Sequence, residues 1–457
     1  MARIAREGSG FAAGALSSRV PMAISQKPIN VALLGCGTVG GGVIRLLTAN
    51  AAALATRVGA PIVVRKVLVR DIVKDRVPEC KRAWLTTNPE DVLGDPETHV
   101  VVEVMGGETP AYDYIRRAMD AKKGVVTANK MLLAGRAHEL VKLAVDRGID
   151  LAFEASVGGG IPIIRLLREA LASDSVESLY GIVNGTSNYI LTRMREDGLP
   201  FGQALAEAQA KGYAEADPTL DIDGHDAAHK VSVLAMLAFG VKVDHAKIPT
   251  EGIRNIEPID HRFAERFDFV IKHLAIGKEH GKRIELRVHP TLVRKSSVLA
   301  NVSGVLNAIY LEGQALGPCL ISGRGAGDMP TAVSVVADIV DVARSMLAGA
   351  AGLSTRGISL DERPLVPLGE VETRYYLRFT GQDLPGVLSR IAGALGEHGV
   401  SIEQMVQDGR SLAPSEPVPI VMITHKAKES GVVAAIAEIS ASNYVTAKTR
   451  VIRIEEV

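Results

Sequence analysis

The segment that most constrains the fold is a glycine-rich turn near the start of the chain, Gly35-Cys36-Gly37-Thr38-Val39-Gly40. It follows the apolar run Ile29–Leu34 and precedes a helical pattern that we expect over residues 39–54. A GxGxxG turn between a strand and a helix is typical of dinucleotide-binding folds. Its glycines permit a tight turn, close approach of a pyrophosphate and close packing of the helix. The N–H groups at the helix start would face the phosphates. An ordinary glycine-rich turn is the alternative.

Short β-rich runs alternate with helical runs from this turn to residue 153. Strands are predicted over residues 29–34, 62–69, 99–104, 124–127 and 150–153, and further helices over residues 112–122 and 135–148. Such alternation favours a parallel sheet covered by helices. We therefore expect a Rossmann-type, NAD(P)-binding domain over residues 28–153.

The chain as a whole is predicted to be of the α/β class, and its remainder predicts two further domains: a mixed α+β domain for substrate binding and dimerisation, and a smaller C-terminal domain. Residues 154–351 mix helical and strand patterns, and their last helix, expected over residues 329–347, should pack back onto the first domain. Residues 352–370 contain glycines, prolines and mixed charges, which predicts a linker. Residues 371–457 follow the order strand, helix, strand, strand, helix, strand, which predicts a ferredoxin-like fold.

Length and composition exclude several classes of protein. A chain of 457 residues needs more than one core. Its 52 basic and 52 acidic residues give no reason to expect nucleic acid or an anionic membrane as a partner. Cys36, Cys80 and Cys319 show no CxxC spacing, and no apolar run approaches the ~18 residues that span a bilayer. These features predict a cytoplasmic protein. Residues 1–27 are expected to be a disordered extension, with an organelle-targeting segment as the alternative.

Two strand ends bear on the cofactor. Arg70 and Asp71 close the second predicted strand. An arginine there would favour NADP through its extra phosphate, whereas an acidic residue would bind the ribose hydroxyls of NAD. Both cofactors stay open, with Arg70 favouring NADP. Gly106 follows the strand over residues 99–104, where a glycine would allow close contact with the nicotinamide.

An acidic string follows in the middle of the chain. Its five carboxylates are Glu215, Asp217, Asp221, Asp223 and Asp226. They could receive a cation, or form a solvated loop in which Asp223 caps a helix, although capping would explain one carboxylate only. His225 and His229 are four residues apart but lack a third metal ligand, so zinc is not expected.

Two lysines are candidates for proton transfer. Lys230 shares a helix face with Asp226 and leads into an apolar helix, so burial could lower its pKa toward the range useful for acid–base catalysis. A surface ion pair is the alternative. Lys130 follows the strand over residues 124–127, and the carboxyl ends of parallel strands border the ligand crevice. A lysine facing solvent at a helix start is the alternative there.

Glu154 precedes three consecutive glycines, residues 158–160. One carboxylate and exposed backbone carbonyls are oxygen ligands of the kind that hard cations prefer. A hinge between domains is the other interpretation, and both could hold.

Together these strings resemble the homoserine dehydrogenase family over roughly residues 29–347. The matching strings are GCGTVG, TANK, FEASVGGGIPII, GIVNGTSNYIL, GYAEADPTLDIDGHDAAHK and GRGAGDMPTA. The tail, with TGQDLPGVL at residues 380–388, resembles an ACT domain. The resemblance implies NAD(P)-dependent interconversion of L-homoserine and L-aspartate 4-semialdehyde in threonine, methionine and isoleucine biosynthesis.

The resemblance also implies roles for particular residues. Lys230 matches the proton-transferring lysine, and Lys130 matches a second lysine near substrate and nicotinamide. Glu215 and Asp226 match residues that hold the amino group and other polar atoms of the substrate. A sodium or potassium site would use Glu154 with the backbone of Val157, Gly159 and Ile161. The implied cofactor contacts are Gly35, Gly37, Thr38, Val39, Gly40, Arg70, Gly106, Lys130 and Gly325.

The ACT-like tail implies L-threonine as a feedback effector, and a paired domain without a ligand is the alternative. A homodimer or homotetramer is expected. Two other functions compete with this one. An aspartate-semialdehyde dehydrogenase needs an acylated cysteine, and no cysteine here has an evident base beside it. A non-enzymatic NADP-binding amino-acid sensor would need no proton relay, so the two lysines argue against it.

Overall fold

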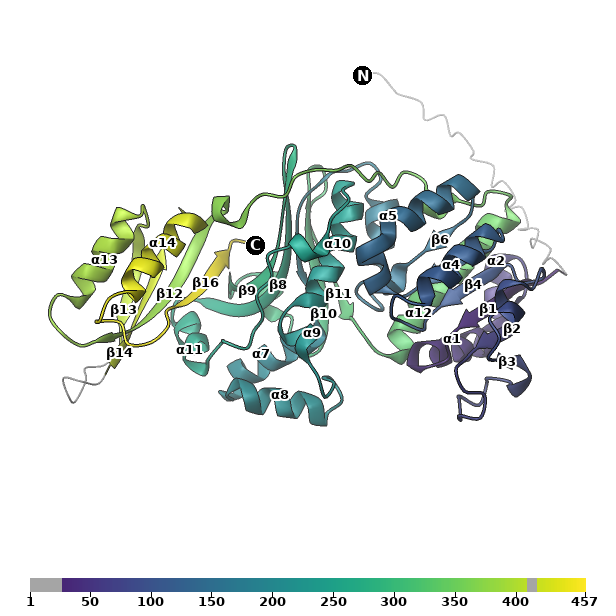
Figure 1. The fold of residues 1–457 in the computed structure, drawn as a ribbon, viewed down its shortest axis with the longest axis horizontal. Helices are drawn as coiled ribbons and strands as arrows, with labels where there is room; N and C mark the ends of the chain where they lie inside the picture. Colours follow the sequence, from purple (N-terminus) through teal and green to yellow (C-terminus); the bar gives the residue numbers. More distant parts are fainter. Residues whose placement is uncertain (1–26, 409–416) are drawn as a thin grey trace, which may run out of the picture.

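The computed structural model describes residues 27–408 and 417–457. The chain forms an elongated molecule with a parallel-sheet domain at one end, a mixed sheet in the middle and a smaller domain at the other end (Figure 1). Apart from Lys27, the extension predicted over residues 1–27 lies outside the described residues.

The first domain contains a six-stranded parallel sheet in the order β3-β2-β1-β4-β5-β6. Its strands are β1 Ile29–Leu34, β2 Ile62–Leu68, β3 Leu85–Thr86, β4 Val100–Glu103, β5 Gly124–Thr127 and β6 Leu151–Ala152. The central strands β1, β4 and β5 are buried along their whole length, as expected where helices cover both faces. The Rossmann-type prediction is confirmed.

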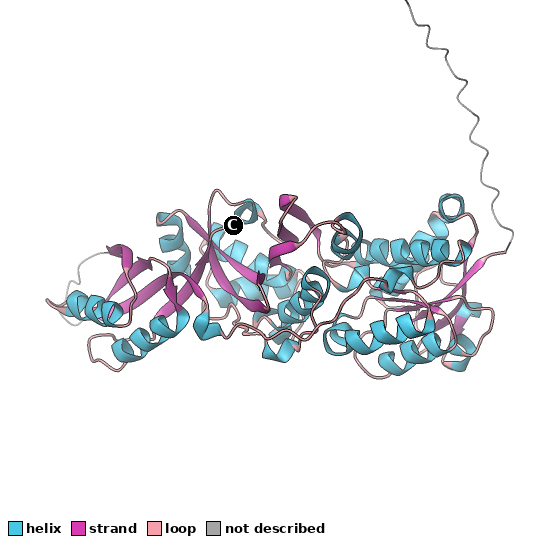
Figure 2. Cartoon of the chain, turned by 90° about the horizontal axis from the view of Figure 1, so that it is seen from above, coloured by secondary structure: helices cyan, strands magenta, loops and turns pink. Residues whose placement is uncertain are grey.

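Helices cover this sheet on both sides (Figure 2). They are α1 Thr38–Ala49, α2 Ala51–Val58, α3 Glu90–Leu93, α4 Ala111–Asp120 and α5 Lys130–Arg147. Helix α12, Asp328–Leu347, returns from the middle of the chain, and its buried Ala332, Val335 and Ile339 share a core with α1 and β1. Helix α12 thus packs against the first domain.

The single helix predicted over residues 39–54 is wrong. The chain bends by 80° between α1 and α2, at Asn50, whose side-chain amide donates to the Leu46 carbonyl at 3.2 Å. Asparagine competes in this way with helical backbone bonds. Among the described residues no single helix has the length and apolar character needed to cross a bilayer; only the bent pair α1 and α2 passes, on length and composition alone.

The middle of the molecule is built on strands β7 to β11. Their bounds are β7 Val176–Ile182, β8 Phe269–His280, β9 Arg283–Arg294, β10 Leu306–Gly313 and β11 Gly317–Arg324, in the order β11-β10-β7-β8-β9. The helices are α6 Ile163–Arg165, which continues as a π-helical turn over Leu166–Ala170, then α7 Gly185–Asp197, α8 Phe201–Ala210, α9 Thr219–Ile222, α10 His225–Phe239 and α11 Pro258–Arg266.

The C-terminal domain has the predicted ferredoxin-like order. Its elements are β12 Glu372–Gln382, α13 Val387–Glu397, β13 Ile402–Gln407, β14 Pro417–Thr424, β15 Ala427–Lys428, α14 Glu429–Ser440 and β16 Arg450–Glu455. One face of the sheet packs Tyr375 and Leu377 against α13 and α14. The other face packs Tyr376 and Ile452 against Phe263 of α11 in the middle domain.

The middle and C-terminal sheets form one continuous sheet of ten strands. Strand β16 pairs in parallel with β9, with Arg453 opposite Thr291 and Glu455 opposite Val293. The segment predicted as a linker, residues 352–370, runs along the molecule toward β12 (Figure 1). It contains the short turns Leu353–Thr355 and Leu368–Glu370, and isolated bridges join its Asp361 to Val241 and its Leu365 to Ile284 of the middle domain.

Candidate active site

The glycine-rich turn has the shape that a pyrophosphate needs. Gly35 has a φ of +104°, and a methyl group on it would lie 3.0 Å from the Val104 carbonyl oxygen. A methyl group on Gly40 would lie 2.5 Å from the Gly35 carbonyl oxygen, so α1 could not approach β1 as closely. A methyl group on Gly37 would meet nothing within 4 Å. Gly37 and Thr38 are exposed at the start of α1. The turn therefore fits a dinucleotide.

Arg70 and Asp71 are both exposed just after β2. The Asp71 carboxylate accepts the Val73 N–H at 2.7 Å. Sequence analysis missed Arg76, whose guanidinium donates to the Cys36 carbonyl at 2.6 Å and to the Asp71 carbonyl at 2.9 Å. Arg76 thus fastens the loop after β2 to the glycine-rich turn. The only signal in the sequence was a third basic residue in this loop.

The turn after β4 is stabilised by the buried carboxylate of Glu103, which sequence analysis also missed. Glu103 accepts the N–H groups of Met105 at 2.9 Å and Gly106 at 3.1 Å, and the Thr127 hydroxyl at 2.6 Å. Gly106 has a φ of +70°, and a methyl group on it would meet nothing within 4 Å. The Asn129 amide donates to the Gly107 carbonyl at 2.6 Å. This open glycine turn therefore lies beside the residue that precedes Lys130.

The two candidate lysines meet on one carboxylate. Asp226 lies in the first turn of α10 and is 3% exposed. The Lys230 ammonium donates to Asp226 Oδ2 at 2.7 Å and to the Val183 carbonyl at 2.6 Å. The Lys130 ammonium forms an ion pair with Asp226 Oδ1. Residues 96 positions apart thus converge between the carboxyl ends of β5 and β7.

The charges in this group are strongly coupled. Burial lowers the pKa of Lys230, and the negative charge of Asp226 partly opposes that shift. Burial alone would raise the pKa of Asp226, but the ammonium groups of Lys230 and Lys130 outweigh it and hold this pKa well below its usual value. Near neutral pH the group therefore contains a firmly ionised carboxylate beside a lysine that releases its proton more readily than a solvated lysine.

Asn184 completes the group and was not predicted as a site residue. Its amide donates to Asp226 Oδ2 at 2.8 Å and to Asp221 Oδ1 at 2.7 Å. Its side-chain oxygen accepts the Ser187 N–H at 2.8 Å and so caps α7. Its position at the end of a strand, directly before a glycine, was the available signal.

The acidic string divides among separate partners. Asp223 pairs with Arg254 at 2.5 Å, and the N-cap residue of α10 is Gly224, so the interpretation of Asp223 as the cap of this helix is wrong. Glu215 is exposed on the loop between α8 and α9, and its backbone carbonyl accepts the Gln209 amide at 3.0 Å. Within the described residues no three His, Cys, Asp or Glu side chains gather as a metal-binding group.

The predicted cation ligands are buried beside α6. Glu154 accepts the N–H groups of Ile164 and Arg165, both at 2.8 Å, and burial raises its pKa. The Gly159 carbonyl accepts the Ser334 hydroxyl at 2.6 Å, and the Ile161 carbonyl accepts the Ile163 N–H at 2.8 Å. Each of these carbonyls keeps a second lone pair, so the loop retains oxygen ligands for a cation.

Gly325 lies against this loop. A methyl group on Gly159 would come within 2.5 Å of the Gly325 backbone, and one on Gly325 would come within 2.0 Å of the Asn307 amide nitrogen. The structure thus brings the predicted cation loop and the GRGAG string together. The contact that the sequence predicts between Gly325 and the cofactor stays a prediction.

Family models match all three parts of the chain. The model described as homoserine dehydrogenase matches residues 162–340, its NAD binding domain matches residues 35–154, and an ACT domain matches residues 375–442. The homoserine dehydrogenase of Pseudomonas aeruginosa is 42% identical over 94% of this chain and 99% of its own length. That of Bacillus subtilis is 41% identical over 88% and 93%.

Solved structures agree with these matches. A homoserine dehydrogenase from Thiobacillus denitrificans superposes with a TM-score of 0.89 at 44% identity, over 94% of this chain and 99% of that one. The Staphylococcus aureus enzyme gives a TM-score of 0.75 at 30% identity, over 95% and 100%. This chain therefore belongs to the homoserine dehydrogenase family of oxidoreductases.

Proposed function

We propose that this chain interconverts L-homoserine and L-aspartate 4-semialdehyde with a nicotinamide cofactor. The observation that carries the proposal is the buried carboxylate of Asp226 held between Lys130 and Lys230. An alcohol–aldehyde conversion needs a group that gives a proton to, or takes it from, the substrate oxygen. Membership of the family supports the choice of substrate pair.

The cofactor would lie across the carboxyl edge of the first sheet. Its phosphates would meet the backbone of Gly37, Thr38 and Val39, and its nicotinamide would lie near Gly106 and Lys130. When bound, it would supply or accept the hydride. Arg70 favours NADP, and the exposed carboxylate of Asp71 leaves NAD possible.

Lys230 is the proposed acid and base. As an ammonium it donates a proton to the aldehyde oxygen while negative charge develops there, and as a neutral amine it takes the proton of the alcohol. Lys130, on the other oxygen of Asp226, is the alternative proton carrier. Asp226 and Glu215 are the proposed partners of the substrate ammonium.

Three further features belong to the proposal. A sodium or potassium ion would bind the backbone carbonyls of Val157, Gly159 and Ile161 beside Glu154, which would stiffen the loop against Gly325. L-threonine would act as an effector at the C-terminal domain, as the ACT match suggests. A second copy of the chain would cover the outer strands β10 and β11, where Leu306 and Leu320 are each 40% exposed.

The absorbance of the reduced nicotinamide tests the proposal directly. Purified protein is given L-homoserine with NADP, then with NAD, in sodium or potassium salts, with and without L-threonine. We expect reduction that depends on homoserine. Lys230→Met should lower kcat by about 10² to 10⁴-fold with little effect on cofactor affinity. Near-normal turnover by this variant would refute the role of Lys230. A folded protein that binds NADP without turning over homoserine would favour the amino-acid sensor.

A further inference from the structure

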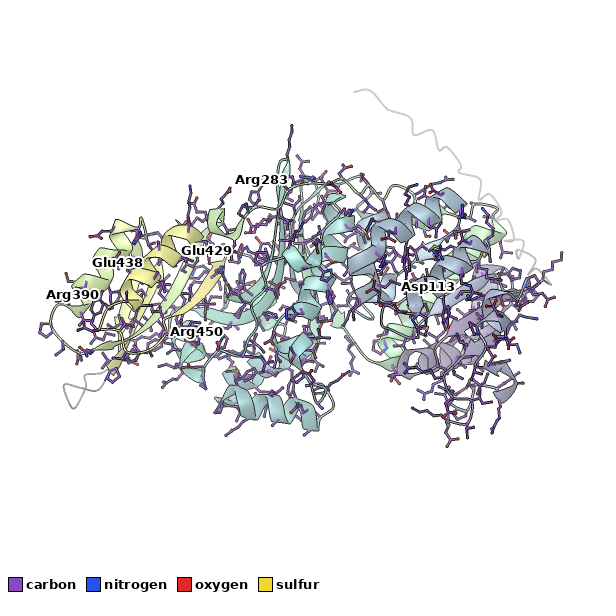
Figure 3. The ribbon with its side chains drawn as sticks, in the orientation of Figure 1. Asp113, Arg283, Arg390, Glu429, Glu438 and Arg450 are labelled. Carbon is purple, nitrogen blue, oxygen red and sulfur yellow. The ribbon has the colours of Figure 1, made fainter. Side chains whose placement is uncertain are left out.

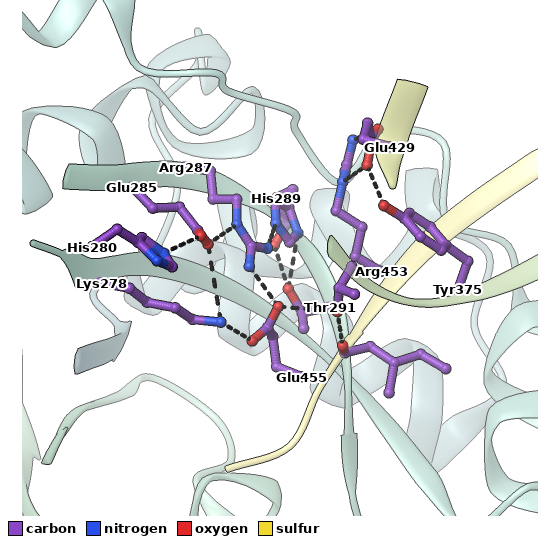
Figure 4. A network of polar contacts seen from close by, with 12 residues as sticks. Lys278, His280, Glu285, Arg287, His289, Thr291, Tyr375, Glu429, Arg453 and Glu455 are labelled. Atoms are coloured by element: carbon purple, nitrogen blue, oxygen red, sulfur yellow. Dashed lines mark hydrogen bonds and ion pairs between the residues drawn. The ribbon is translucent and has the colours of Figure 1, made fainter. Parts of the chain in front are cut away.

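The seam between the middle and C-terminal domains contains a buried network of charges (Figure 4). Arg287 of β9 is 1% exposed and donates to Glu285 at 2.8 Å and to Glu455 of β16 at 2.6 Å. Buried charges of this kind are stable only when each has a partner in good geometry. The network therefore holds β16 in place against β9, in addition to the backbone pairing of the two strands.

Arg453 of β16 connects this network to α14 and to the segment that precedes α11. Its guanidinium makes two bonds to Glu429 of α14, at 2.8 and 2.5 Å, and Glu429 also accepts the Tyr375 hydroxyl at 2.9 Å. Glu429 lies on the side of the C-terminal domain that faces the middle sheet (Figure 3). Arg453 also pairs with Glu251 at 2.8 Å. Glu251 belongs to the middle domain, in residues 249–254, which we call the tether segment.

The tether segment lies between β9 and the turn that precedes α10. The Glu251 N–H donates to the Val288 carbonyl of β9 at 2.8 Å, and the Ile253 N–H donates to the Ile222 carbonyl at 2.8 Å. A methyl group on Gly252 would come within 2.3 Å of that same Ile222 oxygen. The tether segment thus packs on this turn without spare room.

The turn held by the tether segment carries the active-site group. Gly224, with a φ of +89°, directly precedes α10, and a methyl group on it would lie 2.9 Å from the Thr250 side chain and 3.3 Å from the Glu251 carbonyl oxygen. Asp226 follows two residues later and Lys230 one turn further on. Direct contacts therefore connect the last strand of the C-terminal domain with the carboxylate that holds both lysines.

We propose that Glu251 and Arg453 are positioning residues for the active site: their ion pair fixes the tether segment, and the tether segment fixes the start of α10. The proposal rests on the function proposed above, because that function makes the position of Asp226 and Lys230 decisive. A displacement of a catalytic group by about 1 Å can cost up to about 10²-fold in rate. Loss of the ion pair should therefore lower kcat more than it weakens cofactor binding.

Glu251→Gln is the test variant, and Glu257→Gln is its matched control. The two glutamate side chains are 49% and 54% exposed, and each pairs with an arginine of the C-terminal domain, Arg453 at 2.8 Å and Arg378 at 3.0 Å. Glu257 precedes α11 and is not part of the tether segment. Arg453 keeps Glu429 as a partner in the test variant, so no buried charge is left alone.

We expect Glu251→Gln to lower kcat about tenfold, to leave the KM for the cofactor unchanged and to shift the pH profile of kcat. Glu257→Gln should behave like wild type. Hydrogen exchange supplies a second readout, independent of activity: amides in the first turns of α10 should exchange faster in Glu251→Gln than in Glu257→Gln. Equal exchange and equal kcat in the two variants would overturn the proposal. An inactive wild-type protein would instead overturn the proposed function, and exchange would still test the tether.

Discussion

Replacing Asp226 with asparagine removes the one anion that two lysines share. The shape of the side chain is kept, and Asn184 can still donate to the new amide oxygen. Lys230 then lies in the same buried site with its positive neighbour Lys130 and without the carboxylate that it contacts directly, and Asp221 is the remaining negative charge that acts on it. The pKa of Lys230, already lowered by burial, must fall further.

The size of this fall follows from the geometry. The Lys230 ammonium and the Asp226 carboxylate are 2.7 Å apart, and at an effective dielectric constant of about 20 such a pair is worth roughly 4 to 6 kcal/mol. Each pKa unit corresponds to about 1.4 kcal/mol, so three or four units is the upper limit. Water that enters beside Lys130, whose side chain is 40% exposed, will reduce the effect. We expect a fall of at least about one unit.

The assay is kcat/KM for homoserine oxidation as a function of pH. Oxidation needs the neutral amine, so the rate rises with pH through the pKa of the base. In Asp226→Asn this rise should occur at lower pH, with a higher KM for homoserine and a lower maximum. Asp217→Asn, an exposed change in the same acidic string, should leave the profile where it is. A folded Asp226→Asn protein with an unmoved profile would show that neither lysine is the base.

Two further predictions concern the glycine-rich turn and a buried lysine. Gly37→Ala should leave the melting temperature unchanged but raise the KM for the cofactor, whereas Gly40→Ala should also lower the melting temperature, because its methyl group would lie 2.5 Å from the Gly35 oxygen. Equal melting temperatures would contradict this. Burial lowers the pKa of Lys272 from 10.5 to about 7, so the folded state binds this proton less readily than the unfolded state. Burial of the charged ammonium therefore destabilises the folded state. This destabilisation is fully present below pH 7 and decreases as the pH rises toward 10.5. Between about pH 7 and pH 9, Lys272 should therefore add roughly 2 to 3 kcal/mol to the free energy of unfolding, and Lys272→Met should lose that increment in denaturant titrations.

The sequence predicted those parts of the site whose signals are local. A GxGxxG turn lies within six residues, and the spacing of Asp226 and Lys230 places both on one helix face. The contact of Lys130 with Asp226 has no local signal, because 96 residues separate them. The same holds for Arg76, which contacts Cys36, a residue 40 positions earlier in the turn that follows the neighbouring strand β1.

The sequence did not predict two elements that contain buried polar side chains, β8 and α7. Strand β8 contains Lys272 and His273, which are 2% and 4% exposed, although their residue types suggest a solvent-facing surface. Helix α7 begins with Gly185 and contains residues typical of loops. In the structure the Asn188 amide nitrogen lies within hydrogen-bond distance of the backbone carbonyls of Val302 and Gly304, before β10, and of Leu306, the first residue of β10. Such contacts cannot be inferred from residue type.

The parallel pairing of β9 with β16 has a consequence for the order in which the protein can fold during synthesis. Strand β9 ends at Arg294, and its partner begins only at Arg450. While the ribosome makes the residues between them, the middle sheet has an open edge whose side chains include Arg287 and Glu285, still without Glu455. An open edge strand invites pairing with other chains, and charged side chains on it discourage that pairing. The buried charges at the seam would then protect the nascent chain before they join the two domains.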